Sequence, residues 1–424
     1  MDTSMRRILP ALLSLSCVVA TPGAMAQDLD AAIADALASA PELAAAKADE
    51  AAAKARFDRA RAESNPLLRV EGSVGTGRID NHGFFGITAA NTTPLALQGV
   101  AEMPIFAGGR IASAVDQARG GADVAAFQSE QVRLLTVVRA IATYAEVLTA
   151  RKLDARFAQM VAELSEMERQ AGLRFKAGEI ASSELAQARA RRAEAEAGRA
   201  QAQGRLASAE AAFQRLTGKP AGNLASLPPE PATPPTLEEA LDMARTANPA
   251  MKQAKAALGI ARAGARAARA EGMPQIGVFA EAAHVRDQFF PDYRADSVAA
   301  GVRGRWTLFA GGRVAAQTRA ADAGVDASEA RLRQADQALE GMVIDAWTGL
   351  ATARRMVDAT GLQNDAAAEA LRGRKLEAKV GSVPVLALLD AEREAATAEA
   401  ALLEAEGRRL VAAWQLNALT GNIR

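Results

Sequence analysis

The sequence predicts a mainly α-helical protein made of two tandem copies of one unit, each with two β-strands and long coiled-coil helices. Three observations support this fold class. The phrase "PIFAGGRIASA" at 104–114 returns as "TLFAGGRVAAQ" at 307–317. Alanine, the residue with the best helix propensity, is abundant, whereas aromatic residues make up only 4% of the chain. Long stretches without proline carry apolar residues at helical spacing.

The two copies cover almost the whole chain. Internal repeats of this kind are recognised by aligning the sequence with itself. When Leu29 is aligned with Leu237, the copies run in parallel, and after the offset falls by five residues "LTG" at 216–218 matches "LTG" at 419–421. We therefore predict a first repeat over 27–218, a proline-rich linker over 219–236 and a second repeat over 237–421.

The first residues have the pattern of an export signal. Arg6 and Arg7 precede an apolar stretch, and "AMA" ending at Ala26 is a small-x-small cleavage site. We predict a signal peptide over 1–26 and a mature chain that starts at Gln27. A short membrane anchor is the alternative, but the stretch is short for a span.

Cys17 is the only cysteine and lies inside this predicted signal. The mature chain is therefore expected to contain neither a disulfide nor a thiolate zinc site. Lipidation of Cys17 is the alternative, although Ser14 stands where lipoproteins prefer a branched apolar residue.

Each copy is expected to begin with an alanine-rich helix, at about 29–63 and 237–271, followed by two segments in which apolar and polar residues alternate. Period-two alternation predicts strands, and these are long enough to cross a bilayer when tilted. A soluble hairpin, half buried on one side, is the alternative. The expected strands are 67–79, 95–105, 275–283 and 297–309, which form hairpins at about 67–106 and 275–309.

Four strands per chain raise a problem of closure. An open sheet edge in lipid leaves backbone groups unpaired, and known single-chain barrels begin at eight strands. Either the hairpins lie outside a membrane or several chains combine their strands, and three chains would supply twelve. Arg303 and Arg305 alternate with Val302 and Trp306, so the two arginines are candidate lumen-facing residues and Trp306 suits an interfacial aromatic girdle.

A very long helix is expected after each hairpin. From about 110 to 176 there is no proline, and in the second copy apolar residues from Leu339 to Val357 alternate spacings of four and three, which is typical of coiled coils. A helix of about 65 residues spans roughly 100 Å. Gly178 and Gly381 then break the helix and the chain turns back. The resulting helical hairpins are about 110–217 and 313–420.

The repeated phrase is interpreted as a joint between strand and helix. Phe106 and Phe309 are expected to end strands, and the paired glycines that follow permit a sharp bend before the helix begins at an arginine. A phosphate-binding loop is the alternative, but the phrase lacks the lysine and the further glycines of such loops. The predicted joint residues are Gly108, Gly109, Arg110, Gly311, Gly312 and Arg313.

Together these features resemble the TolC family of outer-membrane efflux proteins. The resemblance rests on the twofold repeat and on an ordered set of motifs: "MPIFAGGR" and "WTLFAGGR", "FKAG" before "ELAQARA", "AKVG" before "LLDAERE", and the two "LTG" ends. It implies a homotrimer with a twelve-stranded membrane β-barrel and a periplasmic α-helical barrel. It also implies an adaptor and an inner-membrane pump or ABC transporter as partners, and no cofactor.

The resemblance also implies a constriction at the periplasmic end of the tube, formed by acidic residues after the second turn. Asp390 matches one of these positions, whereas the other holds Ala387. A ring with fewer charges is expected to select less strongly for cations. An ordinary solvated helix charge is the alternative for Asp390.

We therefore expect an export channel in the outer membrane of a Gram-negative bacterium, extending into the periplasm and contacting outer-membrane lipid. Small-molecule efflux is favoured as its task, with type I protein secretion as the alternative. A periplasmic coiled-coil adaptor or scaffold without a pore is the competing class. An enzyme is not expected, because no nucleophile motif or metal-ligand spacing is present and His82 and His284 are isolated. Lysine plus arginine equals aspartate plus glutamate, fifty of each, so no basic field indicates nucleic-acid binding.

Overall fold

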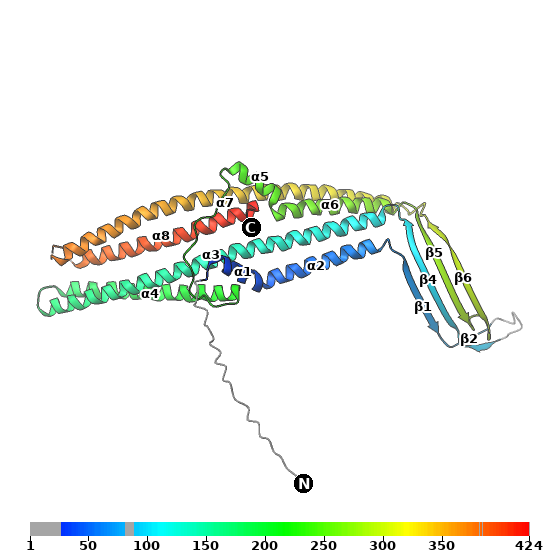
Figure 1. Cartoon of the computed structure of the whole chain (residues 1–424), viewed down its shortest axis with the longest axis horizontal. Helices are drawn as coiled ribbons and strands as arrows, with labels where there is room; N and C mark the ends of the chain where they lie inside the picture. The colour runs from blue at the N-terminus through cyan, green and yellow to red at the C-terminus, as the bar shows by residue number, and fades with distance from the viewer. Residues whose placement is uncertain (1–26, 81–88, 381, 384, 424) are drawn as a thin grey trace, which may run out of the picture.

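The computed structural model describes residues 27–80, 89–380, 382–383 and 385–423. They form a long rod of helices with a β-sheet at one end, bent away from the rod axis (Figure 1). The helices are α1 (Leu29–Ser39), α2 (Pro41–Ala62), α3 (Arg110–Lys176), α4 (Ser182–Thr217), α5 (Leu237–Ala247), α6 (Pro249–Ala270), α7 (Arg313–Lys379) and α8 (Val385–Thr420). The strands are β1 (Leu67–Val74), β2 (Gly77–Ile79), β3 (Ala90–Thr92), β4 (Leu95–Phe106), β5 (Gln275–Arg286) and β6 (Arg294–Arg305).

The prediction of two tandem repeats with long helices is confirmed. Each half of the chain runs through two short helices, a pair of long strands and a helical hairpin. Helices α3 and α7 each have 67 residues, which corresponds to about 100 Å at 1.5 Å per residue. The heptad stripe of α7 is buried, with Leu339, Val343 and Leu350 at 3%, 0% and 1% exposure. These side chains pack against α8, as the four-and-three spacing predicts.

The first helix of each copy is broken, contrary to the prediction of single helices over 29–63 and 237–271. The break falls before Pro41 and Pro249, which start α2 and α6. Proline has no N–H to donate to the preceding turn, and it forces the residue before it out of the helical region. Ala40 and Asn248 accordingly have extended backbones, with ψ of 111° and 128°.

The long strands form one antiparallel sheet in the order β1-β4-β5-β6. Strand β4 belongs to the first copy and β5 to the second, so the centre of the sheet joins the two copies. Helix α3 likewise packs against α6 and α8 of the other copy. The two repeats therefore form one continuous body.

The ends of three predicted strands were wrong, and two of these errors lie at opposite ends of the sheet. The strand predicted over 67–79 stops at Val74, and the short β2 that follows pairs with β3 instead of β4. At the other end of the sheet, β6 stops at Arg305, so Phe309 does not end a strand. Its partner β5 starts at Gln275, opposite Arg305, so the pairing of the two strands ends at that point.

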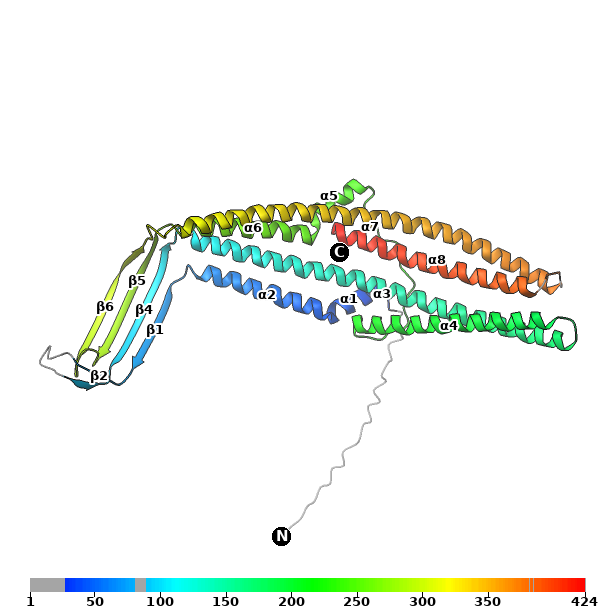
Figure 2. The same cartoon turned by 180° about the vertical axis from the view of Figure 1, so that it is seen from behind.

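A second core lies near the middle of the rod, where α1 and the linker meet α3 (Figure 2). Tyr144 is fully buried there, and its hydroxyl lies 2.8 Å from the carbonyl oxygen of Ala225 in the linker. Burial raises the pKa of the Tyr144 hydroxyl, so the group stays a neutral hydrogen-bond donor. The backbone of Gln27 pairs with the linker at Asn223, while Ala26 lies outside the described residues.

Candidate functional site

The sheet has two chemically different faces. Residues directly opposite each other in an antiparallel sheet point to the same side, so the register assigns every side chain to a face. One face is uncovered and is apolar except at the end that carries His284, Arg286, Arg294 and Asp296. On this face Leu68, Val298 and Val302 are 73%, 85% and 70% exposed. The large apolar side chains of this face are Leu68, Val70, Val74, Leu95, Leu97, Met103, Ile276, Val278, Val298 and Val302.

The opposite face carries most of the charge. Arg303 lies 4.3 Å above the ring of Phe279 and 3.7 Å from the carboxylate of Glu281. Arg69 of β1 lies 3.2 Å from Glu102 of β4. Both predicted lumen residues, Arg303 and Arg305, are on this face, because Arg305 stands opposite Gln275 and two residues from Arg303. The sheet thus has the amphipathic pattern of a wall between an apolar and an aqueous medium.

The outer strands of this sheet are β1 and β6. Within the part of the chain that the structure describes, each pairs with a strand on one side only. A long edge strand presents unpaired N–H and C=O groups and is a template for pairing with another chain. The four-stranded sheet is therefore an open segment with two bonding edges.

Paired glycines connect this sheet to the long helices. Gly108 and Gly109 have φ of 60° and 89°, and Gly311 and Gly312 have φ of 58° and 81°. This left-handed region is readily open only to glycine. Gly109 and Gly312 directly precede α3 and α7, so the bend lies where the strand segment gives way to the helix.

An ion pair at each joint was missed by the sequence analysis. Arg110 lies 3.5 Å from Glu63, and Arg313 lies 2.8 Å from Glu271. Both glutamates directly follow the helix that precedes the sheet, so the pair fastens the end of one helix to the start of the next. The signal was available, because Glu63 and Glu271 occupy equivalent places in the two copies.

The turns of the helical hairpins lie at the far end of the rod (Figure 1). Gly178 has φ of 77° after α3, whereas Gly381 lies outside the described residues. Asp390 is on α8, close to the second turn, and its carboxylate accepts a hydrogen bond of 3.0 Å from Arg191 of α4. Its side chain remains 45% exposed. The described structure therefore pairs Asp390 across the two hairpins, and Ala387 adds no charge beside it.

A buried carboxylate near this end was also missed. Glu392 is fully buried, 2.7 Å from Lys375 of α7 and 3.7 Å from Arg156 of α3. Within the described chain, neither of its oxygens receives a hydrogen bond of normal geometry. Burial, together with the neighbouring Glu163, raises the pKa of the Glu392 carboxyl despite the attraction of Lys375. A signal existed in the sequence: Glu392 lies three residues after the buried Leu389, on the apolar stripe of α8.

We expect Glu392→Gln to raise the unfolding temperature at pH 8 by a few degrees and to have no effect near pH 4.5. A raised folded-state pKa means that the folded chain disfavours the ionised carboxyl. The resulting penalty is absent below the ordinary value of 4.5 and grows as the pH rises through the folded-state pKa. Thermal unfolding followed by circular dichroism in detergent measures this difference.

Glu399→Gln is the matched control. Glu399 contacts the same arginine, Arg156, at 2.9 Å, but its side chain is 46% exposed. Loss of this exposed charge brings no relief from burial and is not expected to raise stability at pH 8. A gain for Glu392→Gln of the same size at both pH values would contradict the assignment.

The histidines and acidic residues form no metal site in the described ranges. No cluster of three His, Cys, Asp or Glu side chains there is arranged to hold a metal ion. His284, one residue past the strand predicted over 275–283, lies in β5, where its ring Nδ1 is 2.7 Å from Asp296 of β6. The reason is that β5 runs three residues past its predicted end, Ala283. His82 lies outside the described residues.

None of the helices in the described residues combines the length and the apolar character needed to cross a membrane.

Comparisons with known proteins agree in one family. The model of the family described as "Outer membrane efflux protein" matches residues 32–219 and 240–422. The outer membrane efflux protein BepC of Brucella suis biovar 1 (strain 1330) is 27% identical over 289 residues, which are 68% of this chain and 63% of that protein. The aligned region thus spans less than two thirds of the length of this curated relative.

Two solved structures share the fold. The Campylobacter jejuni CmeC outer membrane channel superposes with a TM-score of 0.82 at 14% identity, covering 93% of this chain and 85% of that one. The open state of the Neisseria gonorrhoeae MtrE outer membrane channel gives 0.76 at 22% identity, with 93% and 88% covered. At these identities the likeness concerns the fold.

Proposed function

Because the chain belongs to the outer membrane efflux protein family, we propose that it is the outer-membrane channel of a tripartite export system. It passively conducts substrates handed over by a periplasmic adaptor and an inner-membrane pump or ABC transporter, and it catalyses no reaction itself. The observation that carries this proposal is the four-stranded sheet at the end of a helical rod. One of its faces is largely apolar and uncovered, and its two outer strands have no further partner strand in the described chain. Family membership assigns the chain to the outer membrane of a Gram-negative bacterium.

The open sheet supports a trimer. Membrane-embedded sheets must close so that no backbone group remains unpaired, and four strands are too few for a barrel. Three copies that join the β6 edge of one to the β1 edge of the next give twelve strands. The apolar face then contacts lipid, and the face with Arg303 and Arg305 lines the lumen.

The helices form the periplasmic tube in this proposal. Helices α3 and α7 are long enough to extend about 100 Å from the joints at Gly108–Arg110 and Gly311–Arg313. The turns at Gly178 and Gly381 would then face the adaptor, and Asp390 would contribute the charge of a constriction near them. We also propose that 27–218, 219–236 and 237–421 act as first repeat, linker and second repeat.

Small-molecule efflux is the favoured task, and type I protein secretion is the second candidate. A scaffold without a pore is not favoured, since it leaves the uncovered apolar face without a medium to contact. Sensitivity of a deletion strain to drugs and metal ions, compared with analysis of its secreted proteins, separates the two cargo classes.

The channel itself is tested by purifying the chain in detergent and recording single-channel currents in a planar bilayer. We expect a trimer by analytical ultracentrifugation and discrete conductance steps. Asp390→Ala in the same recordings is expected to lower the preference for cations, because a ring of three carboxylates is lost. A monomer that needs no detergent and does not conduct would overturn the proposal, and unchanged selectivity would remove only the role of Asp390.

A further inference from the structure

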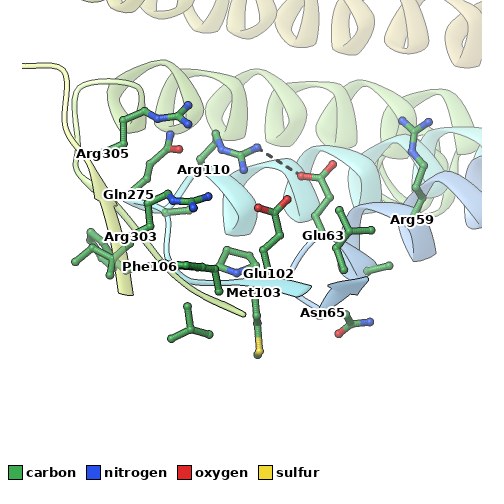
Figure 3. Close-up of a pocket in the computed structure, with 18 residues that line it drawn as sticks. Arg59, Glu63, Asn65, Glu102, Met103, Phe106, Arg110, Gln275, Arg303 and Arg305 are labelled. Carbon is green, nitrogen blue, oxygen red and sulfur yellow. Dashed lines mark hydrogen bonds and ion pairs between the residues drawn. The ribbon is translucent and has the colours of Figure 1, made fainter. Parts of the chain in front are cut away.

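A pocket of about 540 Å³ lies where the polar face of the sheet meets the end of α2 and the start of α3. Figure 3 shows Arg303, Arg305 and Gln275 entering it from the strands, and Glu63 and Arg59 at its helical side. We call this space the junction pocket. The charged residues that line it are Arg59, Glu63, Glu102, Arg110, Arg303 and Arg305.

Its arginines outnumber its carboxylates, and the carboxylates are already engaged. Glu63 pairs with Arg110, and Glu102 pairs with Arg69 outside the lining set. Arg59 and Arg305 have neither an ion pair nor a hydrogen bond within the described chain. The pocket therefore holds positive charge that the protein does not neutralise itself.

Arg303 is held in a position that leaves its donors available. Its guanidinium stacks on Phe279 at 4.3 Å, and the ring of Phe279 lies against Gly301, where an added Cβ would come within 3.3 Å. The nearest carboxylate, on Glu281, is 3.7 Å away, which is too far for a hydrogen bond. Stacking orients the planar group while its N–H edge stays free to bind a carboxylate or phosphate.

Apolar side chains lie beside these cations. Phe279 stands opposite Gly301, and Leu67 and Pro104 share its face of the sheet in the register. All three line the junction pocket. A pocket with apolar walls and a few converging charged groups suits an organic ligand of matching charge.

The twofold repeat does not by itself explain the presence of Arg303 and Arg305. Aligning the joints at Gly109 and Gly312 places Arg303 and Arg305 opposite Val100 and Glu102 of the first copy. Both positions lie in a long strand next to its joint. The two strands form equally well with either set of side chains, so a purely structural role does not account for the basic pair.

We propose that the junction pocket binds amphiphilic organic anions. Arg303 and Arg305 hold the carboxylate, sulfonate or phosphate group, and Phe279, Leu67 and Pro104 contact the apolar body. This rests on the proposed function when the ligand is cargo, because the pocket then lies on the lumenal wall. The exported substrates would then include organic anions that bind transiently where the helical tube meets the barrel.

The test is isothermal titration calorimetry of the full chain in an uncharged detergent. The ligand is 2-naphthalenesulfonate, and neutral 2-naphthol has the same ring system without the charge. We expect the sulfonate to bind more tightly than the naphthol. The double variant Arg303→Gln with Arg305→Gln should weaken binding of the sulfonate by about tenfold or more, because charge-assisted hydrogen bonds are lost. Arg331→Gln with Arg333→Gln, an exposed pair on α7 far along the chain from the joint, should leave binding unchanged.

Arg305→Gln alone is the control for a folding defect, because this side chain has no ion pair or hydrogen bond in the described chain to lose. This single variant should still weaken binding of the sulfonate. Equal affinities of wild type and both pocket variants would overturn the site. Added phosphatidylglycerol that displaces the sulfonate, where phosphatidylcholine does not, would assign the pocket to a lipid headgroup and overturn the cargo role. Planar-bilayer currents are scored separately: a chain that binds but never conducts refutes the channel, and one that conducts without selective binding refutes only the pocket.

Discussion

Val298→Arg is expected to remove the protein from the outer membrane, whereas Ala299→Arg one residue further along the same strand leaves it there. Val298 is on the apolar face near the middle of β6 and is 85% exposed in the single chain. An arginine on the lipid face of a barrel costs about 2–4 kcal/mol near the midplane, or roughly 6–12 kcal/mol for a trimer that carries three copies. Such a loss is comparable to the whole free energy of unfolding of an ordinary fold.

The neighbouring position makes the comparison sharp. Ala299 points to the opposite face and stands directly across from Glu281, so an arginine there meets water and a carboxylate. The two variants differ by one residue and carry the same charge. The amount of heat-resistant trimer in the outer-membrane fraction measures the outcome, and equal amounts for both variants would show that the apolar face does not contact lipid.

Gly108→Ala is expected to destabilise the protein far more than Gly311→Ala, although the two glycines hold equivalent places and nearly the same φ. An alanine with positive φ costs about 1–2 kcal/mol at either position. A Cβ at Gly108 would overlap the Cβ of Met273, whereas no atom of the described chain lies within 4 Å of a Cβ at Gly311. Overpacking adds about 1–3 kcal/mol.

The loss should be visible as a lower melting temperature of the trimer. Met273→Gly removes the Cβ with which the new methyl group would overlap. The double variant Gly108→Ala with Met273→Gly should therefore regain most of the melting temperature by which Gly108→Ala falls below Gly311→Ala. If the two single variants melt alike, the close approach of the chain at the first joint does not limit stability.

Much of the fold was predictable because the sequence contains two copies of the same pattern. The long helices follow from proline-free stretches with four-and-three spacing, and the strands follow from period-two alternation. The errors arose where the length of a strand depends on its partner strand. Strand β6 ends at Arg305 because its partner β5 begins at Gln275. The breaks before Pro41 and Pro249 were predictable from the sequence, because the residue before a proline disfavours the helical conformation.

The site was less predictable, since its contacts join residues far apart in the chain. The pairing of Asp390 with Arg191 connects α8 to α4, and no spacing within either helix indicates it. The same holds for the junction pocket, where Arg59 and Arg305 come from opposite copies. Alternation assigns Arg303 to a face of a strand, but only the register brings it beside Phe279.

The pairing of β4 with β5 inside one polypeptide has a consequence for stoichiometry. A ring of three such chains contains six hairpins related by an approximate sixfold axis, yet covalent fusion makes alternate hairpins distinct. A substitution in one copy is therefore displayed three times around the ring. The duplicated chain can vary its lumen in sets of three, as at Val100 and Arg303, while the six hairpins keep one common backbone plan.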